Sequence, residues 1–244
     1  MRVYVQKGTD NECSNINSFI ALDGFRHLGW EICSYKDSRL LTGNQPEDVV
    51  VGGIGDIKSA FENLNIPFPA PLDYPDELHE FLGRKVWKST VHTIARNPDQ
   101  WNVFIKPARS LKTFPGVLLR EERDLIGCYN PLEDIEIWCS EPVTFLSEWR
   151  CYVRYGKIID VRPYRGDWRL HFDPKIIEDA LKSYTAAPNG YAMDFGVTDK
   201  GETLLVEAND GYALGSYGLF SLDYAKLLSA RWAELTHSTD YCAF

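Results

Sequence analysis

Two acidic side chains and one amide lie on neighbouring apolar segments and are the residues of this chain best suited to chemistry. Glu207 and Asn209 close one apolar run, and Asp194 lies inside the run before it, at residues 191–197. Both runs are typical of β-strands, and Asp199-Lys200-Gly201 between them is typical of a tight turn. Because side chains alternate along a strand, Glu207 and Asn209 share one face, about 7 Å apart.

The pairing of these two strands decides whether the three side chains meet. If Thr198 pairs with Thr203 across the turn, Asp194 lies opposite Glu207, whereas a slip of one residue turns Asp194 away. Facing like charges destabilise a sheet unless a positive group lies between them. A hard cation such as Mg2+ favours this oxygen-rich set and usually completes its shell with phosphates and water. We therefore expect Asp194, Glu207 and Asn209 to bind Mg2+; ordinary turn chemistry is the alternative.

Composition narrows the class of protein. The chain has 244 residues, enough for one large domain or two or three small lobes, and 44% are hydrophobic, which supports a core. The net charge of −9 argues against nonspecific nucleic-acid binding. No apolar run approaches the roughly 20 residues of a membrane span, and the N-terminus reads directly as a strand rather than a signal peptide. We expect a cytoplasmic protein without nucleic-acid or membrane partners.

Six cysteines show no CxxC spacing, and no histidine falls at zinc-finger spacing. Cys33, Cys139 and Cys151 lie in apolar stretches and are predicted to be buried free thiols, with a catalytic thiol as the alternative. The cysteines are Cys13, Cys33, Cys128, Cys139, Cys151 and Cys242.

The pattern of apolar residues predicts an open α/β unit followed by a β-rich region. Within residues 1–66, strands alternate with helices, which indicates a small parallel sheet. Four prolines at 67–75 indicate an extended linker. The expected strands are 2–6, 30–35, 49–53, 103–107, 117–119, 135–139, 148–155, 157–164, 191–197 and a last one ending at 209. The expected helices are 15–28, with Ile16, Phe19, Ile20 and Phe25 as its apolar members, 57–64, 75–82, 174–184 and 221–235.

Basic and acidic side chains lie at several points along the β-rich region. Lys106 ends an apolar strand and Lys112 follows in a Lys-Thr-Phe-Pro-Gly loop, of a kind that folds over nucleotides as a mobile lid. Glu141 and Val143 lie in a proline-restricted segment whose backbone can read an adenine edge, and Glu148 is a candidate for ribose hydroxyls. Residues 148–155 of the long hairpin alternate, which predicts Glu148, Arg150, Tyr152 and Arg154 on one face and Trp149, Cys151 and Val153 on the other. Guanidinium groups suit phosphate and carboxylate, and five arginines gather in and after this hairpin: Arg150, Arg154, Arg162, Arg165 and Arg169.

Taken in order, these features resemble an ATP-grasp enzyme over roughly residues 84–236, and within that superfamily the small R2K clade. No single motif is specific, but the ordered set is. It consists of Gly83-Arg84-Lys85-Val86-Trp87, Phe104-Ile105-Lys106-Pro107, Lys112-Thr113-Phe114-Pro115-Gly116, Ser140-Glu141-Pro142-Val143, Glu148-Trp149-Arg150 and Glu207-Ala208-Asn209-Asp210-Gly211.

The resemblance implies an ATP-grasp fold of mixed α+β and α/β class. It consists of an N-terminal α/β unit (1–75) and two α+β lobes, a small one (76–142) and a C-terminal one (143–244), with ATP between the two lobes. It places Lys106 on the phosphates, Glu141 and Val143 on adenine, and Glu148 on ribose. A further phosphate contact falls on Arg84, with Lys85 and Lys88 as alternatives. Many relatives carry a Gly-rich loop over the phosphates, whereas the corresponding segment here, residues 112–116, contains a proline.

The resemblance also implies a reaction. Family members mostly join a carboxylate to an amine through an acyl phosphate, with ADP as product, so we expect ATP, Mg2+ and an amino-acid or peptide substrate bearing a carboxylate. Arg162 or Arg165 would steady the acyl phosphate, and Arg150 or Arg169 would hold the substrate carboxylate. Three alternatives stay open: a catalytically silent nucleotide-binding module that acts through a partner, an ATP-dependent phosphotransferase, and an unrelated α/β binding protein.

Overall fold

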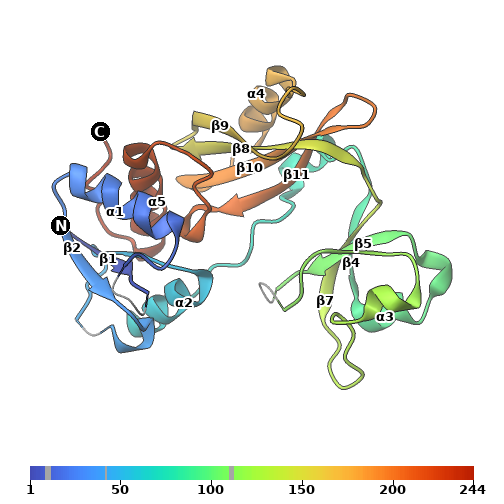
Figure 1. The fold of residues 1–244 in the computed structure, drawn as a ribbon, viewed down its shortest axis with the longest axis horizontal. Coiled ribbons are helices and arrows are strands. Elements are labelled where there is room, and N and C mark those ends of the chain that lie inside the picture. The colour runs from blue at the N-terminus through green and yellow to red at the C-terminus, as the bar shows by residue number, and fades with distance from the viewer. Residues whose placement is uncertain (9–11, 42, 110–112) are drawn as a thin grey trace.

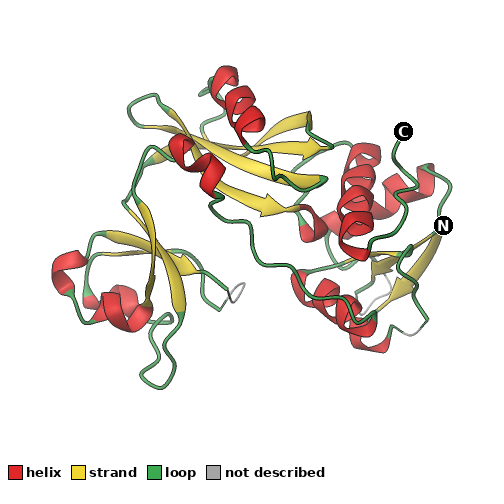
Figure 2. Ribbon diagram, turned by 180° about the vertical axis from the view of Figure 1, so that it is seen from behind, coloured by secondary structure: helices red, strands yellow, loops and turns green. Residues whose placement is uncertain are grey.

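Three β-sheets organise the chain in the computed structural model, which describes residues 1–8, 12–41, 43–109 and 113–244. One sheet is parallel and three-stranded, and two are antiparallel and four-stranded. Figures 1 and 2 show the sheet that carries β4, β5 and β7 standing apart from the rest, while both termini lie beside the parallel sheet. This mixture of sheets and helices confirms the α+β class predicted above.

The N-terminal sheet has the order β2-β1-β3. Val3 and Val5 point from the central strand into the core and are fully buried, as period-two alternation predicts. The asparagine before the first helix caps it, because its side chain accepts a hydrogen bond from the Ser18 amide at 3.0 Å. The elements are β1 (Arg2–Gln6), α1 (Ile16–His27), β2 (Glu31–Tyr35), β3 (Val49–Val51) and α2 (Ile54–Asn63).

Helix α1 buries a different face from the one its large apolar residues predict. Ile16 and Phe19 are 66% and 54% exposed, whereas Phe25 is fully buried. The reason is a close approach to α5 (Ser221–Thr236): a Cβ at Gly24 would lie 2.0 Å from the backbone oxygen of Ser221. Glycine therefore sets the contact face, and two apolar members of the helix, Ile16 and Phe19, lie outside it.

Helix α5 joins the N-terminal unit to the C-terminal part of the chain. Trp232 is buried, packs against Phe61 of α2 with ring centroids 5.0 Å apart, and donates from Nε1 to the Pro46 oxygen at 2.9 Å. The same core cluster includes Tyr152 and Ala192 from the C-terminal sheet. One helix thus packs against both units, and Figure 1 shows it beside α1.

The C-terminal sheet has the order β11-β10-β8-β9 and presents two unlike faces. Cys151 and Phe195 lie on the face covered by α4, where they pack with Ile177 in one apolar cluster. Glu148 and Arg150 lie on the opposite face, so the predicted alternation of the hairpin is confirmed. The elements are β8 (Phe145–Arg154), β9 (Lys157–Gly166), α4 (Pro174–Ser183), β10 (Gly190–Thr198) and β11 (Thr203–Asp210).

The small sheet has the order β4-β7-β5-β6. Its own core contains Ile105, Leu119 and Ile137, all fully buried. The sequence interpretation missed β4 and α3, because the stretch that forms them lacks a clean apolar period. The elements are β4 (Val86–Thr90), α3 (Val91–Ala95), β5 (Val103–Pro107), β6 (Val117–Leu119) and β7 (Glu136–Ser140).

The proline-rich linker runs from α2 to a short 3-10 helix, Asp76–Phe81. On its way it passes the edge of β11, where Asp73 and Ala208 form an isolated antiparallel bridge. Across the described residues, no helix combines the length and apolarity that a membrane crossing needs.

Candidate functional site

A cavity of about 450 Å3 lies where the small sheet faces the C-terminal sheet. Its wall combines residues of both sheets with the segment that joins them: Tyr74, Arg84, Phe104, Lys106, Gly116, Leu118, Ser140, Glu141, Pro142, Val143, Phe145, Glu148, Tyr164, Arg165, Val206 and Glu207. A larger hollow of about 860 Å3 lies beside α3, but its charged members, such as Arg96 and Glu122, are exposed side chains that do not converge. The smaller cavity is therefore the candidate site.

Lys106 is held between two carboxylates at one end of this cavity. Its Nζ donates to Asp73 Oδ1 and to Glu207 Oε2, each at 2.6 Å, and lies 4.5 Å from the centre of the Tyr74 ring. Burial by itself lowers the pKa of Lys106, but Glu207, Tyr74 and Asp73 outweigh it and raise the pKa above the ordinary lysine value. The ammonium is therefore a fixed positive charge.

The three predicted metal ligands meet, although the turn pairs differently from the prediction. Val197, not Thr198, pairs with Thr203, and the register shifts by one residue between Asp194 and Phe195. This β-bulge restores the pairing, so Asp194 does lie directly opposite Glu207. The predicted carboxylate pair is therefore present, although the predicted turn register is wrong by one residue.

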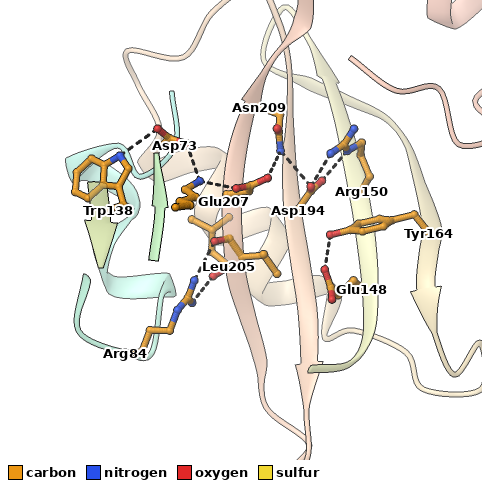
Figure 3. A network of polar contacts seen from close by, with 12 residues as sticks. Asp73, Arg84, Trp138, Glu148, Arg150, Tyr164, Asp194, Leu205, Glu207 and Asn209 are labelled. Carbon is orange, nitrogen blue, oxygen red and sulfur yellow. Dashed lines mark hydrogen bonds and ion pairs between the residues drawn. The ribbon is translucent and has the colours of Figure 1, made fainter. Parts of the chain in front are cut away.

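Asn209 connects the two carboxylates. Its Nδ2 donates to Asp194 Oδ2 at 3.1 Å and to Glu207 Oε1 at 3.3 Å. The predicted shared face of Glu207 and Asn209 is thereby confirmed, and the two acidic side chains point toward one position (Figure 3).

Asp194 has a second, stronger partner in Arg150 on the adjacent strand. Arg150 donates to both carboxylate oxygens at 2.7 Å, and the two side chains are only 9% and 3% exposed. Burial raises the pKa of Asp194 to about 6, although Arg150 opposes the shift. The guanidinium also lies over the rings of Tyr164 and Tyr217, at 5.6 and 4.8 Å from their centres.

Glu148 lines the other end of the cavity and is 6% exposed. Tyr164 donates its hydroxyl to one Glu148 oxygen at 2.6 Å, and Arg165 donates to the other at 2.7 Å. The carboxylate is thus oriented by two partners on β9. Burial first, and then the nearby carboxylates, raise the pKa of Tyr164, so its hydroxyl stays protonated and can donate.

Arg84 lies in the cavity wall with its guanidinium committed to protein atoms. It donates to the backbone oxygens of Leu82, Leu205 and Val206 at 2.7–2.9 Å and to Ser140 Oγ at 3.0 Å. Burial lowers its pKa. Figure 3 shows these contacts reaching the edge of β11, so Arg84 ties the small sheet to the C-terminal sheet.

The other predicted nucleotide contacts fall in different places. Glu141 lines the cavity, and its carboxylate accepts a hydrogen bond from the Lys85 amide at 2.9 Å; Val143 also lines the cavity and is half-buried. Lys85 and Lys88 lie over the rings of neighbouring tryptophans, 5.2 and 4.8 Å from their centres. Lys112 lies outside the described residues.

The arginine cluster divides in two. Arg165 lines the cavity. Arg162 pairs with Asp160 at 2.6 Å and Arg169 pairs with Asp167 at 2.8 Å, both two residues away in sequence, and neither lines the cavity. The roles predicted for Arg150, Arg162, Arg165 and Arg169 stay predictions.

Sequence reasoning missed Asp73, whose carboxylate holds Lys106, and Trp138, whose Nε1 donates to the second Asp73 oxygen at 3.0 Å. Asp73 comes from the proline-rich linker, and no periodicity there predicts which side chain faces the site. Only the path of the linker along β11 brings it in.

The donor set fits a hard divalent cation. Carboxylate oxygens of Asp194 and Glu207 face one point, and the Asn209 side chain, which bridges them, also carries an amide oxygen. Among the described residues no group of three or more His, Cys, Asp or Glu side chains gathers at metal-binding geometry. A cation here would therefore depend on these three side chains together with phosphate and water.

Comparison with known proteins supports the fold described above. Solved structures that share the fold include D-alanine–D-alanine ligase from Bacillus anthracis complexed with ATP, with 15% identity, TM-score 0.59, and 97% of each chain covered. An ATP-grasp RimK domain protein from Sphaerobacter thermophilus has 12% identity and TM-score 0.60, covering 98% of this chain and 100% of its own. A macrocyclase from Microcystis aeruginosa bound with a precursor peptide has 12% identity and TM-score 0.51, covering 93% and 99%.

No curated protein sequence matches the chain. The model of the ATP-grasp domain, R2K clade family 2, matches residues 81–227, which is more than half of the 244 residues. The match includes the small sheet, the joining segment and the sheet that carries the carboxylates. This chain belongs to the R2K clade of the ATP-grasp family.

Proposed function

We propose that this protein is an ATP- and Mg2+-dependent ligase that activates a carboxylate as an acyl phosphate and joins it to an amine, releasing ADP and phosphate. The observation that carries the proposal is the 450 Å3 cavity between the two sheets, which has Lys106 and Glu207 at one end and Glu148 at the other. This spacing of a fixed cation, an acidic pair and a buried carboxylate suits a nucleotide that lies along the cavity.

Each side chain has a distinct task. Lys106 binds the phosphates as a point charge, the backbone of residues 141–143 binds adenine, and Glu148 binds ribose hydroxyls. Asp194, Glu207 and Asn209 hold Mg2+, which when bound neutralises phosphate charge. Arg84 supports the site by fixing β11 to the small sheet, because its donors already bind carbonyl oxygens.

The reaction needs positioning and charge stabilisation rather than covalent help from the protein. A carboxylate oxygen of the substrate attacks the γ-phosphorus, and the bond from that phosphorus to the oxygen bridging it to the β-phosphate breaks, giving acyl phosphate and ADP. The amine then attacks the acyl carbon, inorganic phosphate leaves with the bonding electrons, and the nitrogen loses a proton. Arg150, paired with Asp194 beside the proposed Mg2+ position, is the arginine proposed for the reacting groups, whereas Arg165 contacts Glu148 at the proposed ribose end.

The substrate class that we propose is an amino acid or a peptide. The structural likeness includes a D-alanine–D-alanine ligase and a macrocyclase bound with a precursor peptide, which supports this class by analogy of fold. Localisation in the cytoplasm is proposed with it, because ATP and amino-acid substrates are available there.

ADP release from Mg-ATP in the presence of amino-acid and peptide pools tests the reaction. Hydroxylamine should convert the acyl phosphate into a hydroxamate, which an O-phosphorylated hydroxyl would not give. Glu207→Gln should reduce ADP release by about 100-fold or more, since it removes a charge that positions the reacting phosphates, while its thermal unfolding stays cooperative. Glu202→Gln, an exposed residue at the turn before β11, is the matched control. Full activity of Glu207→Gln would contradict the metal assignment, and ADP release without hydroxamate would favour a phosphotransferase.

A further inference from the structure

Asp73 makes contacts with three strands from a single position in the linker. Its carboxylate accepts from Lys106 on β5 at 2.6 Å and from Trp138 on β7 at 3.0 Å, and its backbone oxygen accepts from the Ala208 amide on β11 at 2.8 Å. Its backbone has a φ of +46°, a region that few residues other than glycine adopt, although aspartate and asparagine are among those that do. A strained backbone therefore presents this carboxylate to the site.

The second oxygen of Asp73 explains why the first one faces the lysine. Trp138 Nε1 fixes Oδ2 (Figure 3), which leaves Oδ1 directed at the Lys106 ammonium. The side chains of Lys106 and Asp73 are 13% and 14% exposed, so little water can replace this contact. The orientation is set by a rigid indole rather than by a flexible partner.

Lys106 has one carboxylate partner more than its charge requires. Both Asp73 and Glu207 contact its ammonium at 2.6 Å, and Glu207 also belongs to the carboxylate pair that faces Asn209. Without a second anion, Lys106 would be left buried and unpaired if the Glu207 side chain turned toward a bound cation. This would lower the stability of the fold unless the lysine moved with the glutamate. Asp73 would then remain as the anion that pairs with Lys106.

We propose that Asp73 is a positioning residue of the nucleotide site. It holds the Lys106 ammonium at the β5 side of the cavity, so that Glu207 is free for the cation and the ammonium stays within reach of phosphate. The inference rests on the proposed function, because it takes Lys106 as a phosphate contact. It adds a linker residue, outside both sheets, that acts through the lysine.

A purely structural role for Asp73 makes a different prediction. The linker is tied to β11 by the backbone hydrogen bond from Ala208, which a side-chain substitution leaves in place. If the carboxylate served only to tether the linker, its loss would lower stability and would change nucleotide affinity by the same factor whether or not Lys106 is present. If it acts through Lys106, the two substitutions must be coupled.

The test is a double-mutant cycle on Mg-ATP binding, measured by calorimetry on the full chain. Asp73→Asn keeps the size and tolerates the positive φ, and we expect it to weaken binding by about tenfold, the loss of one charge-assisted hydrogen bond. In the Lys106→Met background the same substitution should change affinity by less than about twofold. Asp76→Asn, with a fully exposed carboxylate in the same segment, is the matched control and should bind like wild type.

Each outcome decides the inference. Equal effects of Asp73→Asn in both backgrounds, or wild-type affinity of Asp73→Asn, would overturn it while leaving the proposed function intact. Absence of Mg-ATP binding by the wild-type chain would overturn both. Should Asp73→Asn not fold, Asp73→Gly, which also accepts the positive φ, takes its place in the same cycle.

Discussion

Two ion-paired groups meet on the open face of the C-terminal sheet, and they are built in different ways. Arg150 and Asp194 lie on adjacent strands and are directly paired in the ladder, so one sheet determines their geometry. Lys106, Glu207 and Asp73 come from the small sheet, the C-terminal sheet and the linker. The first group is fixed by local folding, whereas the second exists only when the two sheets and the linker are correctly arranged.

The two groups also differ in the pKa of their carboxylates. Burial raises the pKa of both Asp194 and Glu207. At Glu207, Lys106, Asn209 and Arg150 together outweigh burial and lower the pKa below the ordinary value, while the pKa of Asp194 stays raised at about 6. We infer that the ion pair between Arg150 and Asp194 contributes mainly to stability, in addition to the metal role proposed for Asp194, and that Lys106, Glu207 and Asp73 contribute mainly to ligand binding. The following substitutions test that division.

The largest effect is expected for Arg150→Met. It leaves the buried Asp194 carboxylate without its partner, which should lower the free energy of unfolding by about 3–5 kcal/mol in urea denaturation at pH 8. Arg165→Met is the matched control, because Arg165 also pairs with a carboxylate across the sheet but its side chain is 72% exposed; its effect should be far smaller. Equal losses for the two variants would contradict a stability role for the buried pair.

The pH dependence of this loss provides a second check. The folded-state pKa of Asp194, about 6, lies above the unfolded value near 3.9, so the folded state binds the proton more tightly. Stability from this group is therefore present below the unfolded pKa and is lost as the pH rises toward 6. Removing Arg150 raises the folded pKa further, so the loss should be smaller at pH 5 than at pH 8. A loss of unfolding free energy that grew as the pH fell would contradict the raised pKa of Asp194.

Lys106→Met should affect Mg-ATP binding more than the free energy of unfolding. We expect Mg-ATP affinity to fall by about 10- to 100-fold, because a buried charge-assisted contact to phosphate is lost. The free energy of unfolding should change less than in Arg150→Met, because the Glu207 side chain is 29% exposed and the Asp194 side chain only 3%. Calorimetry and urea denaturation on the same samples measure both quantities. A variant that loses stability but binds Mg-ATP normally would erase the distinction between the two groups.

The smallest effect is expected for Tyr164→Phe. It removes the hydroxyl that donates to Glu148 but leaves Arg165 in place, so Mg-ATP affinity should fall only severalfold, corresponding to about 1 kcal/mol for one hydrogen bond. Tyr155→Phe also removes a tyrosine hydroxyl bonded to a carboxylate, Asp240, far along the sheet, and should not alter binding. A tenfold larger effect of Tyr155→Phe would contradict the proposed location of ribose.

The sequence predicts strand geometry better than contacts between units, although it does not predict the ion pair between Arg150 and Asp194. Strand alternation placed Glu148 and Arg150 on one face, and strand pairing placed Asp194 opposite Glu207. The register at the turn was nevertheless wrong by one residue, because a β-bulge cannot be recognised from alternation alone.

The features that depend on tertiary packing were not predictable. Asp73 reaches Lys106 only through the path of the linker, and Arg84 reaches the β11 carbonyls only because two sheets meet. The buried face of α1 likewise follows from the contact of Gly24 with α5 rather than from the positions of Ile16 and Phe19.

Amide hydrogen exchange with and without Mg-ATP tests the central claim most directly, because it needs no knowledge of the substrate. We expect slower exchange in β5 around Lys106, in residues 141–143 and at the end of β11 around Glu207, with little change in β8 and β10, whose ladder already fixes Arg150 and Asp194. Unchanged exchange throughout the cavity wall would contradict the claim that ATP binds between the two sheets.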